Sequence, residues 1–375
     1  MTAREVAVVG AGIVGTAVAR ELAVRGVEVV LLDAGEVSGG TTGLGEGNVL
    51  CSDKDAGPEL DLCIQGLALF DELEERLGAQ ARIRRKGALI VHPDPATWEA
   101  EAERVERLGV EARLVPGGEV GALEPELTGA VHGATLFPGD LQCAPRAIAR
   151  ALASEAEAAG AAVRTGARVQ TVERADGRVT GLVLAGGERI AAGAVVIAAG
   201  PWSSAVARAA GLPLPLEPRK GQLVLLRGPA DVRHKVVDGS YLASAVSGEP
   251  GPQVTTVVET TWDGDVLVGS SRERRGFDTS VDGAVSAAMV NRAARLFPRL
   301  AGLQRAAAWA GLRPWLPDHL PAIGPSRAVE GLWLATGHEG AGVAQGPVTG
   351  RLIAQAYCGE PPLLDPSPFD PDRFA

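Results

Sequence analysis

Residues 4–33 read REVAVVGAGIVGTAVARELAVRGVEVVLLD, and the architecture of the chain follows from them. The apolar run at 4–9 predicts a strand, residues 13–25 predict a helix, and residues 27–32 predict a second strand that ends at Asp33. Neither strand alternates apolar with polar residues, so we expect both faces to be covered, as in a parallel sheet. The stretch therefore predicts a βαβ unit.

A GxGxxG pattern, formed by Gly10, Gly12 and Gly15, lies between the two strands. The first glycine permits a tight turn, the second lets a pyrophosphate approach the backbone, and the third lets the helix pack closely on the strand. The helix start offers N–H groups and a positive dipole end to phosphates. Asp33 can accept both ribose hydroxyls and would repel a 2′-phosphate, which argues against NADP. The pattern predicts a dinucleotide site, and its alternative is a purely structural turn.

Further segments are read from apolar spacing and turn residues. Residues 35–47 are too rich in Gly, Ser and Thr for a regular element, and Asp176-Gly177 and Asp263-Gly264 indicate turns between strands. The spacing predicts helices at 60–77, 95–108, 145–156, 281–297 and 342–357, and strands within 162–197, 221–271 and 331–336.

The order of these segments predicts two domains, each discontinuous in sequence. The fold class is α/β, in an α+β arrangement of a Rossmann-like dinucleotide-binding domain and a substrate domain with an antiparallel sheet. The first domain is assigned residues 1–85, 145–217 and 322–375. The second is assigned residues 86–144 and 218–321.

Composition excludes several functional classes. The 375 residues favour two or three structural units, and 46% apolar with 22% charged residues is typical of globular proteins. The net charge of -10 argues against nucleic acid as a partner. We find neither a transmembrane segment nor a signal peptide, and so expect a cytoplasmic protein. The four cysteines form no CxxC pair and the five histidines show no metal spacing, which predicts free thiols and no metal site.

Two segments bear on which dinucleotide binds. An NAD enzyme usually continues its sheet with further βα units, whereas here a helix and an antiparallel region intervene. Thr41 and Thr42 can hydrogen-bond a second set of phosphate oxygens. The run GHEGAG at 337–342 leads into a helix whose N-terminus can stabilise negative charge on a reduced flavin. Its alternative is an ordinary strand-to-helix turn.

Motif blocks along almost the whole chain carry a resemblance to a known family. They are GAGIVG with LLD at 31–33, FPGD at 137–140, the strand 195–200 with PW at 201–202, KGQ at 220–222, GLRP at 311–314, PD at 317–318 with PAIG at 321–324, and GH at 337–338 with Gly342. In this order they resemble the D-amino acid oxidase superfamily of flavoproteins, which includes glycine, sarcosine and opine oxidases and D-hydroxyproline dehydrogenases. GEGN at 45–48 and SDK at 52–54 look most like the flavin subunits of D-hydroxyproline dehydrogenase and opine oxidase assemblies.

The resemblance implies FAD, bound between the first, middle and last segments. The binding is expected to be noncovalent, because no cysteine precedes the C-terminal glycine-rich turn. It also implies oxidation of a C–N bond beside a carboxylate to an imine, by hydride transfer to flavin N5 and without an obligatory acid or base side chain. The residues assigned to the cofactor are Gly10, Gly12, Ile13, Val14, Gly15, Asp33, Ala34, Thr41, Thr42, Gly47, Asn48, Val169, Ala199, Gly200, Trp202, Lys220, Gly337, Gly340, Gly342 and Val343.

The resemblance also implies residues for the substrate. Arg313 of the GLRP block is expected to grip the substrate carboxylate, since a guanidinium offers two parallel donors. Its alternative is an ion pair with Asp318. His338 and Glu339 can orient the amine or tune the flavin ring, and otherwise His338 supports the turn.

Other candidates keep two interpretations each. Glu46 belongs to the site or to a solvated loop, and Tyr241 belongs to the substrate pocket or to the packing of a strand. Val257 stands where glycine oxidase has a pocket tyrosine, which puts the glycine oxidase mode of carboxylate binding in doubt. Lys220 contacts flavin or a water, or is a charge at a strand end, and Trp202 is a core or cofactor-edge aromatic.

Three functional classes follow. The first is a flavin oxidoreductase acting on a D-amino acid, hydroxyproline, N-alkyl glycine or opine. The second is a flavin subunit that acts only with electron-accepting or Fe–S partner chains. The third is an NAD-dependent dehydrogenase, which a yellow protein would exclude.

Overall fold

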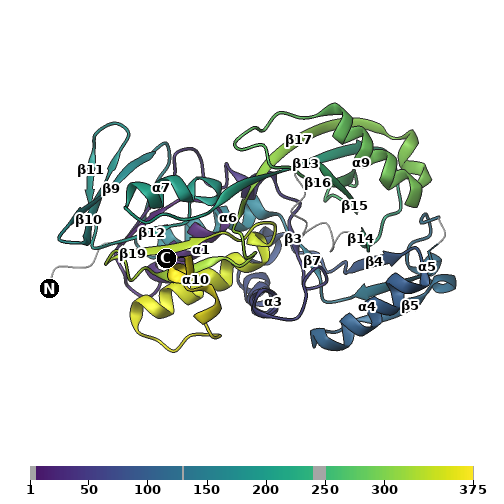
Figure 1. The fold of residues 1–375 in the computed structure, drawn as a ribbon, viewed down its shortest axis with the longest axis horizontal. Coiled ribbons are helices and arrows are strands. Elements are labelled where there is room, and N and C mark those ends of the chain that lie inside the picture. Colours follow the sequence, from purple (N-terminus) through teal and green to yellow (C-terminus); the bar gives the residue numbers. More distant parts are fainter. Residues whose placement is uncertain (1–5, 129–130, 240–250, 375) are drawn as a thin grey trace.

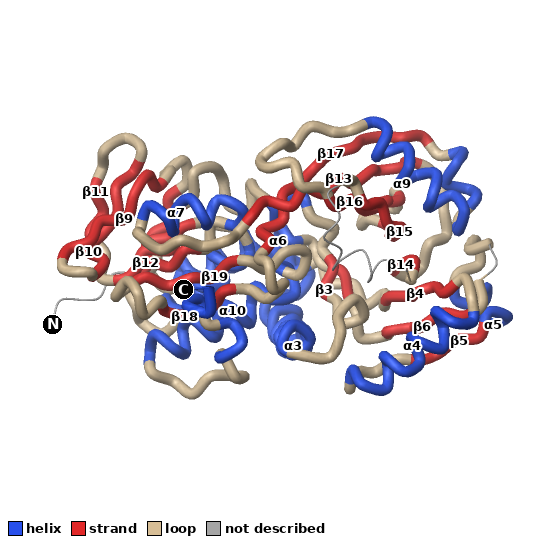
Figure 2. Tube along the Cα trace, in the orientation of Figure 1, coloured by secondary structure: helices blue, strands red, loops and turns tan. Residues whose placement is uncertain are grey.

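The computed structural model of the chain describes residues 6–128, 131–239 and 251–374. It forms two lobes that lie side by side along the longest axis of the molecule (Figure 1). One lobe is built around a six-stranded sheet and the other around an eight-stranded sheet. Figure 2 shows that most of the helices of the second lobe lie on its outer side, away from the first lobe.

The six-stranded sheet contains the predicted βαβ unit. Its order is β18-β19-β12-β1-β2-β8, and all neighbours are parallel except β18, which pairs antiparallel with β19. The strands β1, β2 and β12 are apolar throughout because both faces of the sheet are covered. The strands are β1 Val6–Val9, β2 Val29–Leu32, β8 Ala162–Arg164, β12 Ala194–Ile197, β18 Ala322–Pro325 and β19 Leu332–Thr336.

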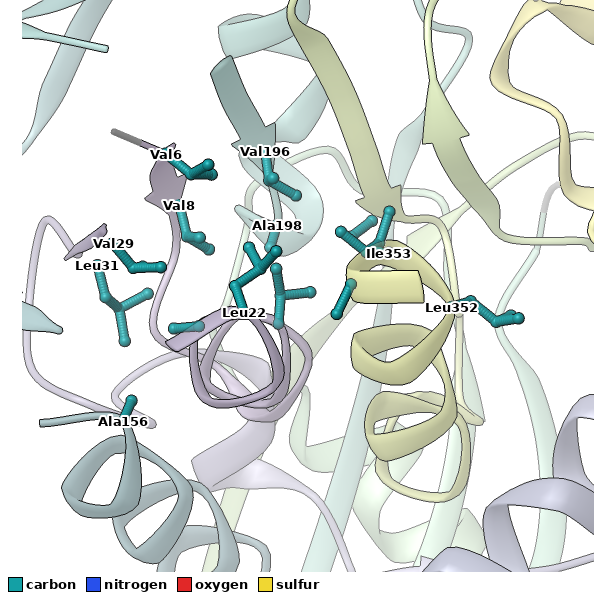
Figure 3. Packing of buried hydrophobic residues seen from close by; sticks show 14 of the residues in the cluster. Val6, Val8, Leu22, Val29, Leu31, Ala156, Val196, Ala198, Leu352 and Ile353 are labelled. Carbon is teal, nitrogen blue, oxygen red and sulfur yellow. The ribbon is translucent and has the colours of Figure 1, made fainter. Parts of the chain in front are cut away.

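Helices cover one face of this sheet and a small antiparallel sheet covers the other. Val8, Leu22, Ala156, Val196 and Ile353 meet in the core on the helical face (Figure 3). A three-stranded sheet of order β11-β10-β9 encloses the second core. The elements are α1 Ile13–Ala23, α3 Pro58–Leu77, α6 Pro145–Ala158, α10 Gly342–Cys358, β9 Val169–Ala175, β10 Arg178–Leu184 and β11 Arg189–Ala191.

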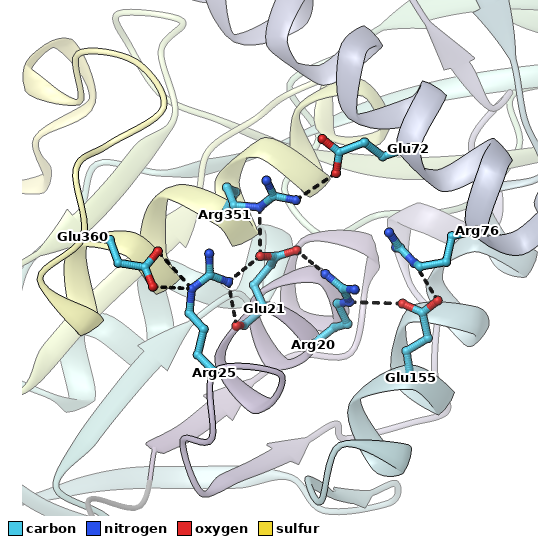
Figure 4. Close-up of polar contacts among 8 residues, drawn as sticks. All are labelled: Arg20, Glu21, Arg25, Glu72, Arg76, Glu155, Arg351 and Glu360. Atoms are coloured by element: carbon cyan, nitrogen blue, oxygen red, sulfur yellow. Dashed lines mark hydrogen bonds and ion pairs between the residues drawn. The ribbon is translucent and has the colours of Figure 1, made fainter.

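Ion pairs tie α1, α3, α6 and α10 together (Figure 4). Glu21 of α1 accepts hydrogen bonds from Arg20 and from Arg351 of α10, at 2.6 and 2.9 Å. Glu155 of α6 bridges Arg20 and Arg76 of α3, at 3.1 and 2.8 Å. Because these contacts surround α1, they help to hold the helix whose N-terminus forms the predicted dinucleotide site.

The eight-stranded sheet runs in the order β17-β13-β16-β15-β14-β4-β6-β5. Its pairs are antiparallel except β14 and β4, which are parallel. The helix α9 packs on β13, β15 and β16, and α4 packs on β4 and β6. The elements are β4 Ala88–His92, α4 Pro95–Leu108, β5 Arg113–Pro116, α5 Gly117–Leu123, β6 Gly133–Phe137, β13 Glu217–Arg227, β14 Lys235–Asp238, β15 Gln253–Thr260, β16 Val266–Arg272, α9 Gly283–Leu296 and β17 Gln304–Trp315.

Short elements complete the description. A two-stranded sheet of β3 and β7 lies between the lobes (Figure 1). The short helices and strands are α2 Thr41–Leu44, β3 Asn48–Val49, β7 Leu141–Gln142, α7 Ser203–Ala209, and the 3-10 helices η1 Gly78–Ala81, η2 Gly200–Trp202, η3 Pro298–Gly302, η4 Ser367–Phe369 and η5 Pro371–Phe374.

The α/β two-domain fold class is confirmed, and one local prediction is wrong. Residues 35–47 contain a helical turn, α2, which two threonine side chains anchor to neighbouring segments: Thr42 Oγ1 accepts from the Ile13 N–H and Thr41 Oγ1 donates to the Leu312 carbonyl. The parallel pair β14–β4 also departs from the expected antiparallel sheet. The domain boundaries stay a prediction, although β3 and β7 pair across the predicted division.

None of the helices in the described ranges combines the length and the apolar character needed to cross a bilayer.

Candidate active site

A cavity of about 860 Å³ lies at the junction of the lobes and receives residues from both sheets. The dinucleotide loop and the ends of β2 and β12 line part of it. Residues of β13, β14, β16 and β17 line another part. A single space therefore joins the predicted dinucleotide site to the predicted substrate residues.

The dinucleotide loop is folded so tightly that two of its glycines have no room for a side chain. Gly10 has φ 110°, and a Cβ there would lie 2.4 Å from the Ala198 carbonyl oxygen. A Cβ on Gly15 would lie 1.8 Å from the Gly10 carbonyl oxygen. This packing brings the N-terminus of α1 to the edge of the sheet, where Gly12 and Ile13 line the cavity. The backbone is therefore exposed where a phosphate group would bind.

Asp33 stands at the end of β2 and is held by backbone donors. Its Oδ2 accepts from the Ala11 N–H and its Oδ1 from the Gly35 N–H, both at 2.7 Å. The carboxylate lines the cavity beside Ala34 and Val169. A fixed carboxylate next to an open glycine loop fits the ribose and pyrophosphate of FAD.

Most of the residues assigned to the cofactor line the cavity. Seventeen do so: Gly10, Gly12, Ile13, Val14, Asp33, Ala34, Thr41, Thr42, Gly47, Asn48, Val169, Ala199, Gly200, Trp202, Gly340, Gly342 and Val343. Trp202 is 46% exposed and stacks on Phe277, with ring centroids 5.9 Å apart, so it is an edge aromatic and not a core residue.

Three assigned cofactor residues lie elsewhere. Gly15 packs beneath the loop, and Gly337, with φ 89°, packs against Leu316. The Lys220 ammonium is buried and lies 2.8 Å from the Asp278 carboxylate. Lys220 therefore does not line the cavity, in contrast to the predicted flavin contact. Asp278 instead provides the counter-charge that a buried lysine requires.

Arg313 lies on β17 and lines the cavity. Its Nη1 donates to the Ser271 carbonyl of β16 at 3.0 Å. The guanidinium passes over Gly221, where a Cβ would lie 2.2 Å from Nη1. The alternative pairing with Asp318 is wrong, because Asp318 binds Arg373 at 2.6 Å.

His338 and Glu339 differ in what they offer the site. The His338 ring is buried and its Nε2 lies 2.9 Å from Thr349 Oγ1, while burial lowers its pKa to about 3. The His338 ring is therefore neutral and bound to α10, which favours the interpretation that it supports the turn. Glu339 accepts from Arg219 at 2.7 Å and lies 3.3 Å from His319 Nδ1.

The electrostatics of Glu339 favour its charged form. Burial by itself would raise its pKa, but the hydrogen bond with His319 and the charges of Arg219, Arg272 and Arg313 outweigh burial and hold the pKa at about 2. Both carboxylate oxygens have partners. Glu339 thus neutralises Arg219, which stands directly across from Arg313 in the β13–β17 pair.

Glu46 lines the cavity as well. Its Oε2 accepts from Asn48 Nδ2 at 2.7 Å and lies 3.8 Å from the Lys235 ammonium. Burial raises the pKa of Glu46 and Glu259 adds to that, while Lys235 and Arg313 oppose it. Its placement excludes the solvated-loop interpretation. Tyr241 lies outside the described residues, and Val257 is a buried core residue.

Sequence reasoning assigned no site role to six charged residues that line the cavity: Glu36, Asp53, Lys54, Arg146, Arg168 and Lys235. Lys54 lies 3.1 Å from Asp53 and 3.2 Å from Glu59. The rarity of lysine could have marked two of these residues. Lysine occurs at only four positions of this arginine-rich chain, and two of them, Lys54 and Lys235, line the cavity.

The cysteines of the described ranges are free thiols. Cys51, Cys63 and Cys143 are buried, and burial raises the pKa of the Cys63 thiol to about 12. Within the described ranges, no group of His, Cys, Asp and Glu side chains is arranged to hold a metal ion.

Comparisons with known proteins find relatives that match almost the whole chain. A model of the DAO family, described as FAD dependent oxidoreductase, matches residues 5–356. Glycine oxidase of Pseudomonas aeruginosa is 32% identical over 373 residues, covering 98% of each chain. The glycine oxidase structure from Geobacillus kaustophilus is 28% identical with a TM-score of 0.85, covering 98% of each chain. Iminodiacetate oxidase from Chelativorans sp. BNC1 is 26% identical with a TM-score of 0.84 and the same coverage.

Proposed function

The chain belongs to the DAO family of FAD dependent oxidoreductases, and we propose that it oxidises the carbon–nitrogen bond of a small amino acid or imino acid. The observation that carries the proposal is that the Arg313 guanidinium and the dinucleotide loop line one cavity. Two relatives are named for the oxidation of glycine and of iminodiacetate, an amino acid and an imino acid.

The residues that line the cavity fit the cofactor. The loop at Gly10 and Gly12, the Asp33 carboxylate and the start of α10 would hold FAD. Bound there, FAD supplies the acceptor for a hydride from the substrate carbon. The N-terminus of α10 presents N–H groups and a positive dipole end to the cavity, which stabilise negative charge.

The second lobe contributes Arg313 of β17 to substrate binding. Arg313 binds its carboxylate through parallel N–H donors, stays charged when partly desolvated and so orients the neighbouring carbon. Loss of a hydride from that carbon and of one N–H proton leaves an imine. Water hydrolyses an open-chain imine to an oxo acid and an amine, whereas a cyclic imine can persist.

The proposal includes a location and a partner. We place the enzyme in the cytoplasm and expect it to pass electrons to a partner chain, of electron-transfer or Fe–S type. The resemblance of GEGN and SDK to the flavin subunits of hetero-oligomeric dehydrogenases supports the partner.

Anaerobic reduction tests the function. The purified chain should be yellow, and its absorbance should bleach when one member of a panel of D-amino acids, N-methylglycine, hydroxyprolines and opines is added. Arg313→Met should keep the colour and bleach at least about tenfold more slowly, because hydrogen bonds to a charged group contribute roughly 1.5–3 kcal/mol. A protein that dithionite bleaches but no panel member bleaches, alone or with its partner, contradicts the proposal.

A further inference from the structure

We infer that Glu46 receives the amino group of the substrate on its Oε1 oxygen, so that the cavity recognises both ends of an amino acid. This inference rests on the proposed function and adds a residue that determines substrate specificity. Its basis is the geometry around Glu46, Gly269 and Arg313.

The backbone next to Glu46 is fixed. Gly47 has φ 86°, and a Cβ there would lie 2.1 Å from the Cys143 carbonyl oxygen. The Gly47 carbonyl accepts from the Cys143 N–H at 2.7 Å. On the preceding side, Thr41 and Thr42 tie the loop to β17 and to the start of α1. The loop therefore holds the Glu46 side chain at one place in the cavity.

The two oxygens of Glu46 have different surroundings. Oε2 is occupied by the Asn48 amide and faces Lys235. Among the residues that the structure describes, no donor reaches Oε1, and the side chain is 17% exposed in the cavity. An acceptor with open hydrogen-bonding capacity in a cavity is suited to an N–H of a ligand.

Two other acids of the cavity, Glu339 and Asp53, are placed differently from Glu46. Glu339 has partners for both oxygens, Arg219 and His319. Asp53 Oδ1 lies 3.1 Å from the Lys54 ammonium and makes no hydrogen bond within the described residues, but it is buried away from the cavity, whereas Glu46 Oε1 lies beside Gly269. Glu46 is therefore the acid best placed to accept a donor from the substrate.

Glu46 and Arg313 lie against the same short stretch of β16. Glu46 Oε1 fills the space beside Gly269, where a Cβ would lie 2.7 Å from it. Arg313 donates to the Ser271 carbonyl, two residues further along the strand. The charge of Arg313 is also close enough to act on Glu46. An amino acid carries its carboxylate and its nitrogen on one carbon, and this pair of side chains offers a cation to the first and an anion to the second.

The consequence is discrimination against carboxylic acids without nitrogen. A ligand that lacks the N–H leaves Glu46 Oε1 without a donor, and a site built for hydrogen bonding rejects such analogues strongly. Oxidation then remains confined to molecules whose nitrogen is already in place beside the reacting carbon.

Calorimetry on the dithionite-reduced holoenzyme separates this role from turnover. The probes are two matched pairs in which a methylene replaces the nitrogen: N-methylglycine against butanoate, and D-proline against cyclopentanecarboxylate. In the wild type, at least one nitrogen member should bind more tightly than its carbon partner. Glu46→Gln should weaken that member about 10- to 100-fold and change the carbon acid less than about threefold.

Two further variants keep the test decisive. Glu46→Asp keeps the charge and should retain part of the discrimination. Glu59→Gln removes a nearby acid that does not line the cavity and should leave the ratio of dissociation constants unchanged. If Glu46→Gln weakens both members of a pair equally, or if Glu59→Gln has the same effect as Glu46→Gln, the inference is wrong. If no panel member reduces the wild-type flavin, it is the proposed function that fails.

Discussion

The positions of two charged side chains in the cavity depend on glycines that leave space for them. Gly221 makes room for the Arg313 guanidinium and Gly269 for the Glu46 carboxylate. Arg219 stands across from Arg313, and its pairing with Glu339 limits the repulsion between the two guanidinium groups. Close contacts with glycine backbone and with one ion pair therefore fix the positions of the charged groups in this part of the cavity.

Gly221→Ala should displace Arg313 without unfolding the chain. The added Cβ would collide with the end of a flexible side chain, 2.2 Å from Nη1, and the strand backbone there needs no positive φ. Binding of butanoate, measured by calorimetry, should weaken about 10- to 100-fold because charge-assisted hydrogen bonds are lost. Gly118→Ala has open space around it and should leave binding unchanged. Unchanged affinity in Gly221→Ala would show that Arg313 does not hold the carboxylate.

Asp140 should make the folded chain more stable on mild acidification. Burial raises the pKa of Asp140 to about 6, although the hydrogen bonds that its carboxylate accepts from the Cys51 and Ser52 N–H groups lower it. Between pH 6 and its ordinary pKa near 4, the folded state binds more protons than the unfolded state. Lowering the pH from 7 to 5 should therefore add about 1 kcal/mol to the free energy of unfolding from this group.

Urea unfolding of the wild type and Asp140→Asn checks that prediction. On lowering the pH from 7 to 5, the free energy of unfolding of the wild type should rise relative to that of Asp140→Asn. A difference that is constant from pH 7 to pH 5 would mean that Asp140 titrates normally.

At the scale of elements, the site depends on close packing between α1 and α10. Both helices begin at the cavity, where Ile13 and Gly342 lie among the lining residues. Two glycines of α10 face α1, and a Cβ on Gly346 would lie 3.3 Å from the Ile13 side chain. The distance between these helices therefore sets the width of the cofactor site.

Gly350→Ala should push the two helices apart. The new Cβ would lie 2.6 Å from the Ala17 carbonyl carbon, which is backbone and cannot swing away. We expect a loss of about 1–3 kcal/mol in the free energy of unfolding and weaker FAD binding. The control is Gly283→Ala on α9, where nothing lies within 4 Å of the new methyl group. A variant as stable as the wild type would refute the tight contact.

At the scale of the whole molecule, the cavity joins two lobes that each have a sheet of their own. Both lobes contribute residues to the lining of one cavity. A ligand that fills it contacts both lobes at once, so its binding is coupled to how they pack together.

Removal of FAD should lower the melting temperature by several degrees. A ligand that binds only the folded state at a thousandfold excess over its dissociation constant contributes about 4 kcal/mol. Differential scanning calorimetry of the apoprotein, with FAD added back as the control, measures the effect. Identical melting of the apo and holo forms would contradict the assignment of the cavity to the cofactor.

Sequence alone predicts the βαβ unit, the GxGxxG loop, Asp33 and most of the helices. These features are local: apolar periodicity selects the element, and a glycine that needs a positive φ or a close approach is visible without knowing its neighbours. The family resemblance added Arg313 in the same way, as one residue within a short block.

The pairing of charges that are far apart in sequence becomes visible only in the folded chain. In the folded chain, Glu46 and Arg313 both lie against β16, Lys220 pairs with Asp278, and Asp318 pairs with Arg373. Lys235, which belongs to no sequence motif, lines the cavity. The physical reason is that the partner of a charged side chain depends on packing between distant segments, whereas secondary structure and glycine turns depend on adjacent residues.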